Sequence, residues 1–116
     1  MKVLSRQATQ TVDQLRDEIL ATRKDVRAAR ERSRMKRSIS MALVGLRKSA
    51  GLTQSELAAR VGWDKSYVSR LEGASGGLPD LETLRHYANA CQVCARLEFG
   101  LGAGEDFRVV ETVKFL

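Results

Sequence analysis

The sequence is poor in the residues that disulfide frameworks, secretion signals and membrane spans require. Its two cysteines, Cys91 and Cys94, cannot build a disulfide framework, and it contains no run of eighteen apolar residues. The first ten residues, MKVLSRQATQ, lack the apolar stretch of a secretory signal. These absences favour a protein of the reducing cytoplasm, and the charge described below would associate it with the nucleoid.

The patterns of catalytic and metal sites are missing as well. Cys91, Cys94 and His86 offer three zinc ligands, but a structural zinc site takes four, and neither a second CxxC nor an HxxxH is present. His86 has no serine or cysteine arranged beside it as a nucleophile, and Gly100–Gly104 lacks the following helix of a dinucleotide fingerprint. We therefore expect no enzyme activity, no metal and no cofactor.

Positive charge is concentrated in the first half of the 116 residues. The net charge is +6, but residues 1–50 hold 13 Lys/Arg and 5 Asp/Glu, whereas residues 51–116 hold 7 and 9. This asymmetry indicates either a polyanionic partner or a solvated basic helix surface, and charge alone does not choose between them. The length suits one small domain with an appendage.

A helix is predicted near the N-terminus, because residues 11–44 contain no proline and no glycine. We expect it to run from Thr11 to about Ser33, with cationic last turns, and it can continue into the next helix. Apolar or small residues recur there at alternating steps of three and four, namely Val12, Leu15, Ile19, Thr22, Val26 and Ala29. This stripe can pack against the protein's own core, a dimer mate or a protein partner.

Four further elements follow along the chain. A second stripe, out of phase with the first, predicts a helix that Gly51 ends, with Ile39, Ala42, Leu43, Leu46 and Ala50 on it. A capping box at residues 53–56 starts a short helix that ends at Gly62. Asp64 is a suitable N-cap for a helix over Lys65–Glu72, closed by Gly73. Asp80 caps a helix to about Cys91, with inward residues Leu81, Leu84, Ala88 and Cys91.

The tail differs in composition from the rest. Leu97–Leu101 and Phe107–Leu116 are rich in Val, Phe and Leu, and the segment 102–104 separates them with two glycines. This pattern predicts a β-hairpin. Because an isolated hairpin is marginal in water, we expect the helices or a second subunit to cover it.

The segment 54–73 reads as two short helices joined by a tight turn at Gly62-Trp63. At about 100° per residue, one arc of the second helix is polar and free of acids, while the opposite arc is mainly apolar. The apolar arc is expected to pack on Leu57, Ala58 and Val61. The side chains of the polar arc can bind phosphates and base edges. The alternative is that this arc is an ordinary solvated helix face.

The segments LRKSAGLTQSELAARVGWDKSYVSRLEG and LPDLETLRHYANA resemble the Cro/C1-type (XRE) helix-turn-helix family. The resemblance implies a mainly α, five-helix-type lambda-repressor-like DNA-binding domain at residues 38–95, after a basic helical arm (1–37) and before a hairpin (96–116) that can dimerise. It also implies double-stranded operator DNA as the partner. We expect a homodimer, because each motif reads only a few base pairs and the hairpin has apolar surface to cover. The DNA-binding residues that the resemblance implies are Gln54, Lys65, Ser66, Ser69 and Arg70, and its implied interhelical salt bridge joins Arg47 and Glu72. Trp63 departs from the small or β-branched residue usual there, and we expect it to pack over the turn.

A narrower resemblance concerns the charged helical extension and the run LETLRHYANACQVCARLEF, which together are similar to HigA-like antitoxins. These partner RelE/HigB-type ribonuclease toxins and repress their own operon. Such toxins are usually basic, and the basic arm here would repel them at long range. A stand-alone, phage-type repressor without a toxin is the alternative. The acid-free polar arc argues against a third reading, an interaction module that does not bind DNA.

Overall fold

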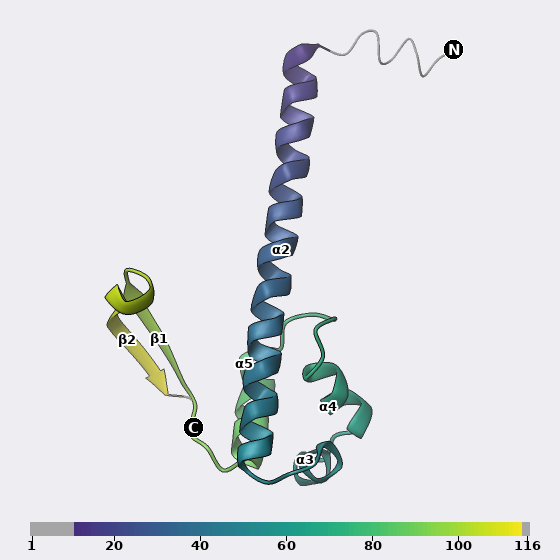
Figure 1. Cartoon of the computed structure of the whole chain (residues 1–116), viewed down its shortest axis with the longest axis vertical. Coiled ribbons are helices and arrows are strands. Elements are labelled where there is room, and N and C mark those ends of the chain that lie inside the picture. The colour runs from purple at the N-terminus through teal and green to yellow at the C-terminus, as the bar shows by residue number, and fades with distance from the viewer. Residues whose placement is uncertain (1–10, 115–116) are drawn as a thin grey trace. The chain divides into compact units, whose positions relative to one another are not determined.

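The computed structural model describes residues 11–114, which are mainly helical and end in a two-stranded antiparallel sheet (Figure 1). The elements are α2 (Val12–Ser49), α3 (Gln54–Val61), α4 (Lys65–Leu71), α5 (Leu81–Ala90), β1 (Arg96–Leu101), a short 3-10 turn η1 (Gly104–Asp106) and β2 (Arg108–Lys114). The predicted mainly α class with a C-terminal hairpin is confirmed. Residues 1–10 of the predicted arm and the last two residues of the predicted second strand lie outside this range.

The two helices expected before Gly51 form the single helix α2. Its start is a capping box, in which the Thr11 N–H donates to Gln14 Oε1 at 2.9 Å and the Gln14 N–H donates to Thr11 Oγ1 at 3.1 Å. No proline interrupts it, and the first positive-φ residue after it is Gly51. The chain divides into two compact units between Arg34 and Met35. No helix in residues 11–114 is long and apolar enough to cross a membrane.

Local signals set the ends of the shorter helices. The Thr53–Glu56 capping box forms with both of its hydrogen bonds at 3.1 Å, and Gly62 ends α3 in the left-handed conformation at φ 86°. Asp80 caps α5 by accepting from the Thr83 N–H at 2.8 Å. Asp64 occupies the N-cap position of α4, as expected, but its side chain makes no capping hydrogen bond.

The core of the second unit is built where α2, α3, α4 and α5 meet. Leu57, Val68 and Tyr87 are fully buried, and the other members of the cluster include Leu43, Leu52, Leu71 and Cys91. The predicted inward position of Leu81 is wrong, since this side chain is 53% exposed. It lies in the first turn of α5 and is not part of the cluster. Tyr87 takes the central place that the sequence pattern did not assign to it.

The hairpin pairs Leu97 with Val113 and Phe99 with Glu111, and its register shifts between Phe99 and Gly100. The Cβ of any side chain at Gly100 would lie 2.3 Å from the Arg108 carbonyl oxygen, so only glycine fits at this close approach of the strands. Several of the hairpin's large apolar side chains stay exposed, among them Phe99, Leu101, Val109, Val110 and Val113.

Candidate nucleic-acid interface

Helix α4 has one exposed polar face and one buried apolar face. Its side chains Val68 and Leu71 are buried in the core, where they meet Leu57 and Ala58 of α3. The opposite side presents four exposed residues whose side chains carry hydrogen-bond donors or acceptors: Lys65, Ser66, Ser69 and Arg70. The helix KSYVSRL contains no acidic residue. We call these four residues the α4 face, and its chemistry is cationic and hydrogen-bonding.

The turn before α4 is held by aromatic packing. Trp63 is half-buried and meets Tyr67 edge-on, with ring centroids 4.9 Å apart and planes at 83°. It also lies edge-on to His86 of α5, at 6.4 Å. The indole therefore packs over the turn, as expected, and leaves the α4 face clear. The Arg70 guanidinium lies 5.9 Å from the Tyr67 ring centre, within the range of a cation–π contact.

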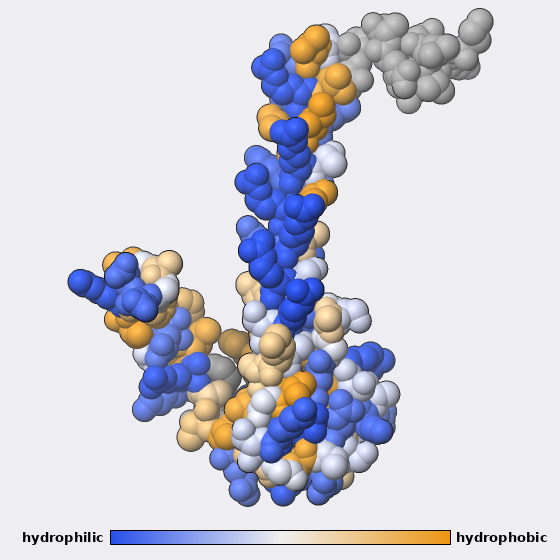
Figure 2. Space-filling view, in the orientation of Figure 1, coloured by the Kyte–Doolittle hydropathy of each residue, from blue (hydrophilic) through white to orange (hydrophobic). Residues whose placement is uncertain are grey.

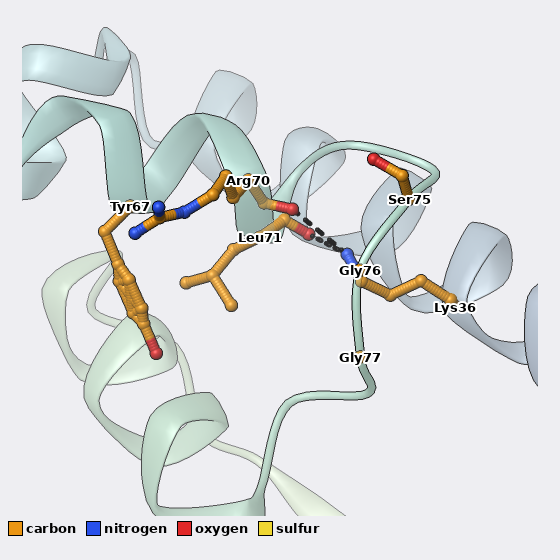
Figure 3. Close-up of a pocket in the computed structure, with 7 residues that line it drawn as sticks. All are labelled: Lys36, Tyr67, Arg70, Leu71, Ser75, Gly76 and Gly77. Carbon is orange, nitrogen blue, oxygen red and sulfur yellow. Dashed lines mark hydrogen bonds between the residues drawn. The ribbon is translucent and has the colours of Figure 1, made fainter.

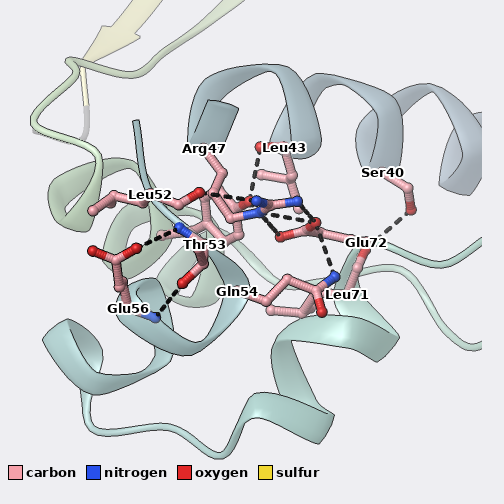
Figure 4. Close-up of polar contacts among 10 residues, drawn as sticks. Ser40, Leu43, Arg47, Leu52, Thr53, Gln54, Glu56, Leu71 and Glu72 are labelled. Atoms are coloured by element: carbon pink, nitrogen blue, oxygen red, sulfur yellow. Dashed lines mark hydrogen bonds and ion pairs between the residues drawn. The ribbon is translucent and has the colours of Figure 1, made fainter. Parts of the chain in front are cut away.

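A buried polar cluster ties α4 to α2 and α5 (Figure 4). Arg47 donates to both carboxylate oxygens of Glu72, through Nε at 3.1 and 2.9 Å and through Nη2 at 2.9 Å, and its Nη1 donates to the Leu52 carbonyl at 2.9 Å. The Tyr87 hydroxyl lies 2.8 Å from both Glu72 Oε2 and the Leu43 carbonyl, so its one proton can be donated to either. The predicted Arg47–Glu72 pair is thus present in the structure, immediately after the last residue of α4.

Gln54 belongs to the same cluster. Its amide nitrogen donates to Glu72 Oε1 at 3.3 Å, and its side chain is half-buried. Burial by itself would raise the pKa of Glu72, but hydrogen bonds from Arg47, Tyr87 and Gln54 hold that pKa below its ordinary value. Glu72 is therefore ionised at neutral pH. The implied role of Gln54 in DNA binding remains a prediction, and this side chain is already hydrogen-bonded to Glu72 at the first turn of α3.

Lys36 is a site residue that sequence reasoning missed. Its side chain is buried, 2% exposed, and its Nζ donates to the carbonyls of Arg70, Leu71 and Gly73 at 3.2, 3.0 and 2.8 Å. These carbonyls lie at the C-terminal end of α4. There the backbone acceptors have no partner within the helix, and the helix dipole places a partial negative charge. Burial lowers the pKa of the Lys36 ammonium. A lysine of the cationic segment thus caps the helix that carries the α4 face.

Ser40 completes this cap. Its hydroxyl accepts from Lys36 Nζ at 3.1 Å and lies 2.7 and 3.0 Å from the Gly73 and Leu71 carbonyls. The buried face of α2 therefore runs through Lys36, Ser40 and Leu43, while Ala42 and Ala50, expected on that face, are exposed. The four- and three-residue spacing of Lys36, Ser40 and Leu43 was a usable signal, but two of the three residues are polar.

A shallow hollow of about 220 Å³ opens beside the end of α4 (Figure 3). The residues that line it come from α2, α4 and the following loop: Lys36, Tyr67, Arg70, Leu71, Ser75, Gly76 and Gly77. The Lys36 ammonium is hydrogen-bonded to the helix-end carbonyls, and Arg70 is the other cationic residue of this lining.

Comparison with known protein families gives one match. The family model described as a helix-turn-helix domain matches residues 24–98, more than half of the chain. The matched range includes α3, α4 and α5 in full. No curated protein and no solved structure matches the chain.

Proposed function

The chain belongs to the helix-turn-helix domain family and is a DNA-binding transcription regulator, and from that premise we propose that it is a sequence-specific repressor whose α4 face reads the operator. The α4 face is the observation that carries this proposal. Lysine and arginine can meet phosphates or guanine O6 and N7 in the major groove, and serine hydroxyls can donate to or accept from base edges. The Arg47–Glu72 cluster and the Lys36 cap both anchor the C-terminal end of this short helix to α2.

We expect Arg70→Ala and Lys65→Ala to weaken operator binding without unfolding the protein, because both side chains are exposed. A residue that contacts a base should cost about 1–3 kcal/mol of binding free energy and relax specificity at one position. A residue that contacts phosphate should weaken all sequences alike and reduce the salt dependence. Fluorescence anisotropy with the DNA upstream of the chain's own gene, at several salt concentrations, measures both effects.

Arg85→Ala provides the matched control, because Arg85 is an exposed cation of α5 paired with Glu82. It should leave operator affinity unchanged. Wild-type affinity in both Arg70→Ala and Lys65→Ala would contradict the assignment of the α4 face.

We further propose that the repressor acts as a homodimer. One α4 face spans only a few base pairs, whereas two copies can read paired half-sites about one helical turn apart, roughly 10 bp between centres. The operator should accordingly be palindromic.

The narrower function we propose is that of an autoregulating antitoxin, with the hairpin as the surface that holds the toxin. Residues 96–116 carry three basic and four acidic side chains, so the hairpin avoids the repulsion that the basic arm would impose on a basic toxin. Leu97, Phe99 and Val113 share one face of it, and both Phe99 and Val113 are at least half exposed. Such a face suits an apolar contact or an added strand.

Co-expression with the product of the adjacent gene tests this function. We expect a stable complex that restores growth, and we expect Phe99→Asp or Val113→Asp to abolish both while operator binding persists. A truncated apolar residue at the centre of an interface costs about 2 kcal/mol or more. Thr112→Asp, on the opposite face beside Glu98, is the control and should neutralise normally. If no toxic partner is captured and deletion of the neighbouring gene changes nothing, the stand-alone repressor is the correct function.

A further inference from the structure

The apolar stripe on the part of α2 that precedes Met35 is exposed along its whole length. Val12, Leu15, Ile19 and Val26 are 74%, 48%, 44% and 46% exposed, and Figure 2 shows apolar side chains along this part of the helix among hydrophilic ones. We propose that residues 11–34, here called the arm segment, pair with the same segment of a second copy as a parallel, in-register, two-stranded coiled coil.

The spacing of the stripe is that of heptads. With Val12 at position a, the a positions are Val12, Ile19 and Val26, and the d positions are Leu15, Thr22 and Ala29. Every a residue is β-branched, and the first d residue is leucine, which is the combination that favours two parallel strands. The alternation of three and four residues is kept over all six positions, as a supercoiled seam requires.

A hollow on the helix surface fits this arrangement. It is lined by Leu15, Glu18, Ile19, Thr22 and Arg23. In a parallel pair, each side chain at an a position inserts into a hole formed by four residues of the partner helix. These four are the residue at the same a position, the d and g residues just before it, and the d residue just after it. For Ile19 of the second copy, those four residues are Leu15, Glu18, Ile19 and Thr22, so the hollow lies where that side chain would insert.

The charges beside the seam select the second copy and its direction. The e positions are Arg16, Arg23 and Arg30, whereas Glu18 and Asp25 occupy g. A parallel pair places g against the next e of the partner, which brings Glu18 to Arg23 and Asp25 to Arg30 on both sides. An antiparallel pair would place e against e and g against g, and so arginine against arginine and carboxylate against carboxylate. Within residues 11–34, the described ion pair is Asp13–Arg16, which leaves these four groups available.

The same rule says where the coiled coil ends. The next g and e positions are Arg32 and Arg37, which repel each other. The attractive contacts therefore stop at Arg30, close to the boundary between the two compact units. The two chains separate there, as two DNA-binding units on neighbouring half-sites must.

This inference deepens the proposed homodimer, and it rests on that proposal only for the presence of two copies. Sedimentation velocity of the full chain should show a dimer at micromolar concentration. The variant Leu15→Asp/Ile19→Asp should dimerise at least tenfold more weakly, with unchanged helix content by circular dichroism because within a single chain both side chains are exposed. Leu20→Asp is the matched control, since Leu20 is 47% exposed but lies off the seam, and it should remain dimeric.

Charge exchange tests the direction. Glu18→Arg/Asp25→Arg should break the dimer, and adding Arg23→Glu/Arg30→Glu to it should restore the dimer, because the g-to-e attractions return with reversed sign. The control Asp17→Arg/Glu31→Arg adds the same positive charge at outward f positions and should remain dimeric. Equal dimerisation of the doubly and quadruply exchanged variants would overturn the parallel arrangement.

Other outcomes identify a different occupant of the stripe. A monomeric wild type, or a dimer that survives Leu15→Asp/Ile19→Asp, overturns the arm segment as the dimer contact. If the dimer survives Leu15→Asp/Ile19→Asp, the hairpin becomes the candidate dimer surface. If the same variant also fails to capture the toxin, the stripe is the toxin-binding surface. Operator binding by the α4 face is measured separately, so failure of the coiled coil is distinguishable from failure of the repressor function.

Discussion

Glu72→Ala should lower the free energy of unfolding by about 3–5 kcal/mol, because it leaves a charge without its partner inside the protein. The Glu72 side chain is 2% exposed and the Arg47 side chain 12% exposed. Removal of the carboxylate takes away the acceptor for Arg47, Gln54 and Tyr87 together. Urea unfolding followed by circular dichroism measures this loss.

Two comparisons isolate the reason for this loss. Glu82→Ala removes an exposed carboxylate that pairs with Arg85 at 2.7 Å on α5, and it should leave stability unchanged. The double variant Arg47→Met/Glu72→Met should lose less than the sum of its single variants, because no unpaired charge then remains. A loss after Glu72→Ala no larger than that after Glu82→Ala would contradict the importance of this cluster.

Lys36→Met should destabilise the protein by about 1.5–3 kcal/mol, the value of hydrogen bonds to a charged group, and should also weaken operator binding. Methionine fills the space of the lysine stem but donates nothing, so the carbonyls of Arg70, Leu71 and Gly73 lose their charged donor. The last turn of α4, which carries Ser69 and Arg70, then loses its anchor to α2. Urea unfolding and anisotropy with operator DNA give the two readouts.

Lys48→Met is the matched control for this variant, because it removes an exposed lysine from the same helix. It should unfold like the wild type. Equal stability of the Lys36 and Lys48 variants would mean that the carbonyls find other donors. A Lys36→Met protein that is destabilised but binds the operator normally would assign the cap to stability alone.

Much of the candidate site follows from local patterns. One capping box at Thr53 and one glycine, Gly62, set the ends of α3, and the helical periodicity of α4 separates exposed Lys65 and Arg70 from buried Val68. These signals concern residues within one or two turns of each other, so the sequence contains all the information they need. The Arg47–Glu72 pair, separated by 25 positions, was predictable only through resemblance to a family.

The sequence by itself therefore determined the helices, their caps, the outward face of α4 and the heptad spacing of the arm segment, because each depends on neighbours along one helix. Only the tertiary structure decided that Lys36 is buried and that Leu81 is exposed. A lysine in a cationic segment is expected to be solvated, and its burial here depends on carbonyls 34 to 37 positions away that accept hydrogen bonds from its ammonium. A leucine on an apolar stripe is expected to be buried, but Leu81 lies in the first turn of α5, outside the core cluster. Burial depends on what packs against a residue, and periodicity within one helix does not contain that information.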